Sequence, residues 1–146
     1  MRNISAILAT LALAVGGTLL AAPIASAAPA ANYGCAGSKI DTYTVADSRF
    51  GGTWGYVNLY YSSSNSGTNC AVYVATKYVG TVHGMEIEIK RSNQSSWISD
   101  NGRYTKYAGP VTVGGTNGTC IDLEVKSEAP DASVGFGSEF LGVHCG

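Results

Sequence analysis

Hydrophobic and polar residues alternate along much of the chain beyond residue 30, and this pattern predicts β-strands. It is clearest at residues 85–90 and 121–126, where every second side chain is apolar. Because successive side chains of a strand point to opposite faces, each stretch has one apolar and one polar face. Weaker alternation predicts further strands at residues 43–47, 54–62, 69–76, 104–108, 110–113 and 139–144. We therefore expect an all-β fold, a single antiparallel β-sandwich or small barrel of about seven or eight short strands.

Turn-forming residues indicate where these strands reverse or bend. Asn101-Gly102 is the dipeptide best suited to a two-residue hairpin turn, so a reversal is expected there, with residues 95–99 as the partner strand. Asn117-Gly118 predicts a second turn of the same kind. Pro110 follows Gly109 and cannot donate to a strand ladder, which places its strand at a sheet edge or at a bulge.

Residues 1–27 are typical of a secretory signal peptide. Arg2 supplies a positive charge, residues 4–20 are almost entirely apolar, and Ala25-Ser26-Ala27 gives the small-residue pattern of a cleavage site. The alternative, a retained membrane anchor, requires roughly 20 apolar residues without such a site. We expect residues 28–146 to form a single secreted β domain, with no membrane association after cleavage.

The cysteines fit an exported protein. An even number in an oxidising compartment indicates two disulfides, formed among Cys35, Cys70, Cys120 and Cys145. The sequence alone allows three pairings of the four cysteines. Neighbour pairing is preferred because it closes loops of about 35 and 25 residues, each worth roughly 3 to 4 kcal/mol in the chain-entropy model.

Charge and motifs exclude several classes of function. Without Arg2 the chain has eight basic and ten acidic residues, and a charge of −2 is too small to indicate nucleic acid or an anionic membrane as partner. His83 and His144 complete no zinc pattern, so neither a metal nor another cofactor is expected.

Catalysis is not indicated either. No Gly-x-Ser-x-Gly motif frames a nucleophile, and His83 and His144 are the only candidate bases. Glu86 and Glu88 share one face of a predicted strand and could be an acid and base pair for glycoside cleavage, but Lys90 shares that face and makes a solvated surface the better interpretation. We expect a protein that is not an enzyme.

Aromatic residues supply the one candidate binding surface. In the strand at residues 54–62, alternation places aromatic side chains on one face, and a hairpin with the next strand adds another. The predicted ligand-binding residues are Trp54, Tyr56, Asn58, Tyr60 and Tyr73. Flat rings on a rigid sheet suit the apolar faces of sugars, while the amide and hydroxyl groups form hydrogen bonds. The alternative is that these aromatics pack beneath a second sheet or stabilise cross-strand pairs.

Four segments of the chain resemble the spore-associated protein A family, small secreted proteins of actinobacteria. These segments are residues 69–72, 102–111, 118–122 and 142–146, and the most specific is Tyr104-x-x-Tyr107-Ala-Gly-Pro-Val between two cysteine-bearing strands. The resemblance covers nearly the whole mature chain. It departs at residues 123–125, Leu-Glu-Val here, where the family tends to have Trp-Gly-Gly. It implies an exported protein of the spore or cell surface with no established enzymatic activity.

The sequence thus predicts a secreted, non-enzymatic, surface-associated protein that binds wall or spore-coat polysaccharide through an aromatic sheet face. Two alternatives remain. A secreted protease inhibitor would present residues 128–133 as a loop braced by the disulfides, and a small hydrolase would use His83 or Glu86.

Overall fold

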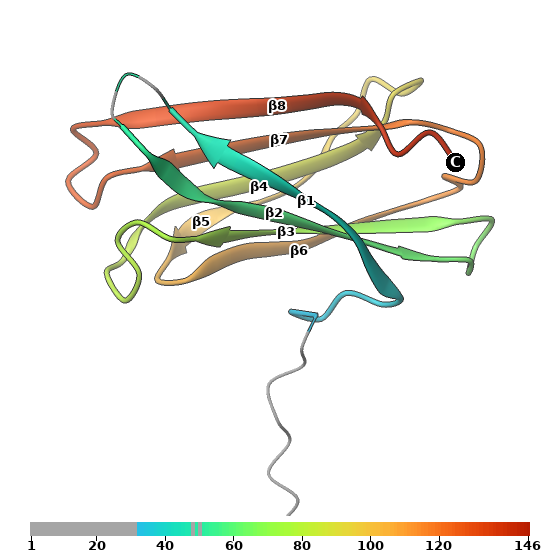
Figure 1. Cartoon of the computed structure of the whole chain (residues 1–146), viewed down its shortest axis with the longest axis horizontal. Helices are drawn as coiled ribbons and strands as arrows, with labels where there is room; N and C mark the ends of the chain where they lie inside the picture. Colours follow the sequence, from blue (N-terminus) through green and yellow to red (C-terminus); the bar gives the residue numbers. More distant parts are fainter. Residues whose placement is uncertain (1–31, 48, 50) are drawn as a thin grey trace, which may run out of the picture.

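Eight antiparallel strands form two four-stranded sheets packed face to face (Figure 1). The computed structural model describes residues 32–47, 49 and 51–146, so the predicted signal peptide lies outside the described residues. The strands are β1 (Ser38–Ala46), β2 (Thr53–Ser62), β3 (Thr68–Ala75), β4 (His83–Arg91), β5 (Ile98–Tyr104), β6 (Tyr107–Gly114), β7 (Ile121–Glu128) and β8 (Gly135–Val143). The prediction of an all-β, disulfide-braced fold is confirmed, and its architecture is a sandwich.

The chain moves between the two sheets several times. Sheet A has the strand order β1-β2-β3-β6, and sheet B has the order β5-β4-β7-β8. Hairpins join neighbours within a sheet, whereas the β3–β4, β5–β6 and β6–β7 connections cross from one sheet to the other. The edge strand β6 of sheet A therefore follows directly after the edge strand β5 of sheet B.

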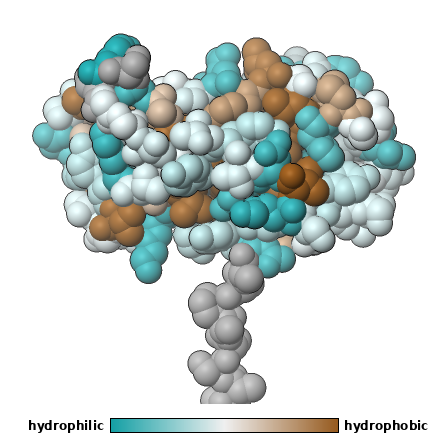
Figure 2. Space-filling model, in the orientation of Figure 1, coloured by the Kyte–Doolittle hydropathy of each residue, from teal (hydrophilic) through white to brown (hydrophobic). Residues whose placement is uncertain are grey.

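The apolar faces of the two sheets meet in one core. Because the side chains of a strand alternate, the polar residues between the core positions face outward, and the face seen in Figure 2 is mostly polar with small separate apolar patches. The core side chains are Val45, Trp54, Val57, Leu59, Ala71, Tyr73, Ala75, Met85, Ile87, Ile89, Ala108, Val111, Val113, Ile121, Leu123, Val125 and Phe136. The two strands with the clearest alternation, β4 and β7, lie side by side at the centre of sheet B.

The hairpin predicted at Asn101-Gly102 is wrong. Both residues lie inside β5, and Gly102 pairs with Met85 of β4. Gly102 is needed because the ring of Tyr104 folds over it, and a Cβ there would lie 2.8 Å from that ring. The Tyr104 hydroxyl donates to Asp100 Oδ1 at 2.5 Å, and this hydrogen bond is the main reason that the pKa of Tyr104 is raised.

The reversal occurs instead between β5 and β6, inside the segment predicted as a strand at residues 104–108. Asp100 closes this corner, since its Oδ2 accepts a hydrogen bond of 2.6 Å from the amide of Gly109 on β6. The prediction for Pro110 is confirmed, because β6 is an edge strand and its pairing with β3 has a bulge there. A turn at Asn117-Gly118 is confirmed, but it is not a hairpin turn of the predicted kind, because only Gly118 has a positive φ and the connection from β6 to β7 crosses between the sheets.

The disulfides join Cys35 to Cys70 and Cys120 to Cys145, so neighbour pairing is confirmed. The first ties the segment before β1 to the middle of sheet A, and the second ties the residue before β7 to the end of the chain. Two disulfides and no free cysteine among the described residues indicate that the protein folds in an oxidising environment.

Asp122 connects three strands of sheet B. Its Oδ1 accepts hydrogen bonds from the Ser92 hydroxyl at 2.6 Å and from the Gly142 amide at 2.9 Å, and its Oδ2 lies 3.3 Å from Lys90 Nζ. Burial by itself raises the pKa of the Asp122 carboxyl, but these partners outweigh it and the pKa is lowered. The ionised carboxylate therefore stabilises the fold.

We expect Asp122→Asn to lower the free energy of unfolding by about 1 to 3 kcal/mol at neutral pH, because three donors lose a charged acceptor that is itself buried. The lowered pKa makes this contribution fully present above the ordinary value of 3.8, and it is lost as the pH falls through the folded-state pKa. Urea unfolding of both proteins at about pH 7 and pH 3 measures the difference. Glu139→Gln, at an exposed position of β8, is the control and should change little. If the two proteins differ more in free energy of unfolding at pH 3 than at pH 7, the stabilising role assigned to the Asp122 carboxylate is contradicted.

Candidate binding surface

Aromatic side chains form a row across the outer face of sheet A. Tyr56 of β2 pairs with Val74 of β3, which pairs in turn with Tyr107 of β6. Directly paired residues point to the same side of a sheet, so these three side chains stand next to one another. Tyr56 and Tyr107 are 38% and 39% exposed, which leaves part of each available for contact.

Polar groups lie further along the same face. Asn58 follows Tyr56 at the next outward position of β2, and its Oδ1 accepts a hydrogen bond of 3.2 Å from the Thr42 hydroxyl of β1. Tyr60 follows at the next outward position and pairs with Cys70. The structure therefore places Tyr56, Asn58 and Tyr60 on one face, as the alternation predicts.

The segment before β1 lies over this face and places Tyr33 on it. The disulfide from Cys35 to Cys70 holds the segment down, and the Tyr33 ring packs edge-on against Tyr107 with 5.0 Å between the ring centroids. Tyr33 has a φ of 55°, a left-handed conformation that is uncommon for a bulky side chain. Tyr60 is almost buried beneath this segment, and burial raises the pKa of its hydroxyl.

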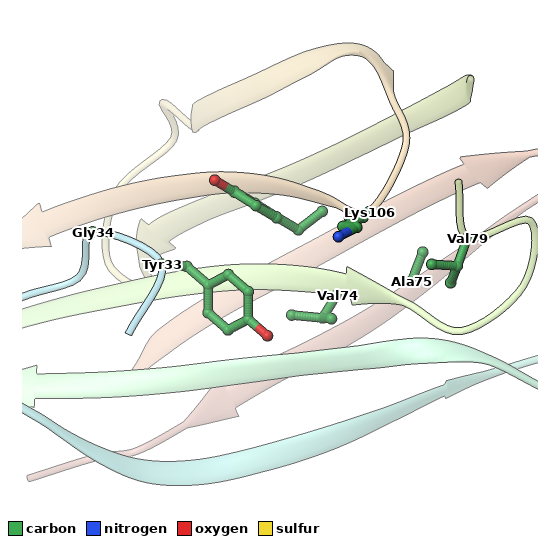
Figure 3. Close-up of a pocket in the computed structure, with 7 residues that line it drawn as sticks. Tyr33, Gly34, Val74, Ala75, Val79 and Lys106 are labelled. Carbon is green, nitrogen blue, oxygen red and sulfur yellow. The ribbon is translucent and has the colours of Figure 1, made fainter. Parts of the chain in front are cut away.

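Tyr33 separates two hollows on the outer face. Figure 3 shows its ring beside Val74, with Lys106 and Val79 further along the larger hollow. The larger hollow has a volume of about 630 Å³ and is lined by Tyr33, Gly34, Val74, Ala75, Val79, Lys106 and Tyr107. The smaller one, of about 340 Å³, is lined by Asn32, Tyr33, Gly37, Lys39, Asn58 and Tyr60.

The two hollows differ in chemistry. The larger presents aromatic and aliphatic side chains with one ammonium group, and its size lies within the range of ordinary ligand sites. The smaller presents the amides of Asn32 and Asn58, the phenol of Tyr60 and the ammonium of Lys39. Together they offer flat apolar surface beside groups that donate and accept hydrogen bonds.

The outer face of sheet B differs from that of sheet A. Lys126 Nζ lies 3.1 Å from Glu88, 3.1 Å from Glu124 and 3.4 Å from Glu86. Burial by itself lowers the pKa of Lys126, but hydrogen bonds and charge from Glu124 and Glu88 reverse this and raise it. These charged groups form ion pairs with one another, and the three carboxylates surround one lysine.

Trp54 is not part of the outer face, contrary to the prediction. A bulge between β1 and β2 leaves Trp54 without a partner, because Val45 pairs with Gly55 and Ala46 with Thr53. The extra residue changes the side to which Trp54 points. Its side chain is 1% exposed and packs in the core, with its ring centroid 4.5 Å from that of Phe136.

Tyr73 also lies in the core, where it is 0% exposed. The predicted face of β3 was wrong, because Tyr73 pairs with Val57 and therefore shares the inward side. Gly55 leaves space for its ring, since a Cβ at that position would lie 2.5 Å from Tyr73 Cε2. The Tyr73 hydroxyl donates to the Trp54 carbonyl oxygen at 3.2 Å, so the packing alternative describes these two aromatics.

The sequence interpretation missed Tyr33 and Tyr107, which complete the surface. Tyr107 could have been found, because it precedes the alternating residues of β6 and lies in the most specific segment of the resemblance. Tyr33 lies in no periodic segment. Its only signal is its position two residues before Cys35, whose partner Cys70 lies on an outward position of β3.

The two histidines considered for catalysis lie in different surroundings. His83 is buried, with Nδ1 2.8 Å from the Thr81 carbonyl oxygen, and the His144 ring packs against Tyr61. Residues 128–133, considered for a protease-inhibitor loop, comprise the last residue of β7 and most of the tight turn to β8, where the Ala129 amide donates a hydrogen bond of 2.7 Å to the Val134 carbonyl oxygen.

Within the described ranges, no cluster of three or more histidine, cysteine or acidic side chains is arranged to hold a metal ion. The same residues contain no helix with the length and apolar character needed to cross a membrane. Comparisons with protein-family models, with curated proteins and with solved structures each found no match.

We expect Trp54→Ala to lower the free energy of unfolding by about 3 to 5 kcal/mol, because it leaves a cavity in the core. Trp97→Ala is a matched control, since Trp97 is only partly buried and lies over Lys90, with Nζ 4.7 Å from the ring centroid. Urea unfolding of the two variants checks this placement. Equal losses of stability would contradict it.

Proposed function

We propose that the chain is a secreted, non-enzymatic protein of the cell or spore surface that binds polysaccharide through the outer face of sheet A. The observation that carries this proposal is the position of Tyr33, which the disulfide holds between two hollows and against Tyr107. A site of this kind binds by contact and needs no reacting group.

The chemistry of the face suits sugars. The C–H faces of a sugar ring pack against Tyr33, Tyr56 and Tyr107, whose rings are held by neighbouring strands and the disulfide. Asn58 and the tyrosine hydroxyls supply hydrogen bonds around the ring. Because the groups are fixed before the ligand arrives, binding requires little additional ordering of the protein.

The predicted location fits this ligand. The resemblance to the spore-associated protein A family implies a surface protein, and the disulfides agree with folding outside the cytoplasm. Wall and spore-coat polysaccharides are the glycans that such a protein would meet.

We expect the double variant Tyr33→Ala and Tyr107→Ala to bind polysaccharide at least about tenfold more weakly than the unmodified mature chain, because two stacking rings are lost. Retention on chitin, cellulose and peptidoglycan, followed by titration on the best of them, measures the change. Thermal unfolding of the variant should remain cooperative, since the Tyr107 side chain is partly exposed and neither tyrosine belongs to the central core.

Trp97→Ala is the aromatic control, in the loop that joins β4 and β5 of sheet B, and should bind as well as the unmodified chain. A loss of retention in Trp97→Ala instead of the tyrosine variant would contradict the assignment to sheet A. Absence of retention on every polysaccharide would contradict the proposed function itself.

A further inference from the structure

The cationic side chains of the mature chain divide into two groups. Six of the eight have a partner for their charged group, either a carboxylate, a carbonyl or an amide oxygen. These six are Arg49, Lys77, Lys90, Arg91, Arg103 and Lys126. Among the residues that the structure describes, Lys39 and Lys106 are the two whose ammonium groups make no hydrogen bond or ion pair.

Both of these lysines lie at the candidate binding surface. Lys106 lines the larger hollow and Lys39 lines the smaller, on opposite sides of Tyr33. No carboxylate lines either hollow. The described ion pairs other than that of Arg49 with Asp47 all lie on sheet B, so the unpaired positive charge is concentrated on the other sheet.

The spacing of the lysines constrains the ligand. Lys39 pairs with Tyr60 on β2, whereas Lys106 lies opposite Ala75 near the far end of β3, where its carbonyl accepts from the Ala75 amide. Lys39 lies on β1 and Lys106 lies next to β6, so the two residues are three strand spacings apart across sheet A. They are also offset by about five residues along the strand direction, and together these offsets place their backbones roughly 20 Å apart. This distance exceeds the width of one sugar ring, so a ligand that meets both charges is a chain of rings with repeated negative groups.

We propose that the preferred ligand is an acidic polysaccharide whose sugar rings carry carboxylates, as in a polyuronate. This inference rests on the proposed function and specifies its ligand. Rings in the middle of the bound segment stack on Tyr33 and Tyr107, and carboxylates of rings further along the polysaccharide reach Lys39 at one end and Lys106 at the other. A polyanion without rings would interact with the two lysines but would not stack on the tyrosines. The net charge of the mature chain is −2, so the chain as a whole does not attract polyanions.

The test compares binding of the mature chain to polygalacturonate, to its fully methyl-esterified form and to polyglutamate. The ester has the same rings without the charge, and polyglutamate has carboxylates without the rings. We expect polygalacturonate to bind about tenfold more tightly than the ester at low salt. This advantage should shrink between about 0.1 and 1 M NaCl, where the Debye length falls from roughly 10 to 3 Å.

Substitution of the lysines identifies the residues responsible. Lys39→Gln with Lys106→Gln should weaken binding to polygalacturonate by about tenfold more than binding to the ester, and so remove the preference. Lys126→Gln with Arg103→Gln removes the same charge from sheet B and its edge, and should change binding by less than about twofold. Lys39→Arg with Lys106→Arg should retain the preference.

Each failure has a different meaning. Equal binding of acid and ester that depends on Tyr33 and Tyr107 overturns the acidic preference and leaves polysaccharide binding intact. Polyglutamate bound as tightly as polygalacturonate overturns the requirement for rings. Equal weakening by the two double substitutions overturns the assignment to Lys39 and Lys106. No binding to either sugar polymer, or to chitin, cellulose and peptidoglycan, overturns the proposed function as well.

Discussion

Side chains from β2 and β3 pack against those from β4 and β7, and this apolar layer decides which residues of each strand face water. Leu59 and Tyr73 on one sheet, and Ile87 and Leu123 on the other, are fully buried. Since the period of a strand is two, every outward position follows once these inward positions are fixed. The outer face of sheet A is therefore set by the core beneath it. The disulfide between Cys35 and Cys70 holds the segment before β1 over that face, and this segment places Tyr33 between two hollows.

The fold class could be predicted from the sequence because β4 and β7 alternate without interruption, and burial of Met85, Ile87 and Ile89 follows directly from that pattern. That the chain does not reverse at residues 101–102 could not be predicted, because this depends on a contact between Tyr104 and Asp100 across Gly102. A glycine that leaves space for an aromatic ring and a glycine that permits a turn have the same letter in the sequence. The contacts of the folded chain distinguish them.

The candidate site was predictable only in part, for a related reason. Alternation along β2 correctly grouped Tyr56, Asn58 and Tyr60, whereas one unpaired residue in the β1–β2 ladder turned Trp54 inward. The register between β2 and β3 decided the side of Tyr73, and register depends on the turn that joins the strands rather than on either strand alone. The disulfide between Cys35 and Cys70 holds Tyr33 on this face, and a disulfide leaves no periodic pattern in the sequence.

The corner between β5 and β6 also affects how the molecule behaves among its own copies. Because these two edge strands follow each other around one side of the sandwich, β1 and β8 are the strand edges on its other side. The β1 edge is irregular, since its ladder shifts register between Lys39 and Asp41 and again after Val45. Charged residues and bulges of this kind hinder edge-to-edge pairing between copies. The same irregular strand that supplies a lysine to the candidate site therefore also protects the protein against aggregation by strand addition.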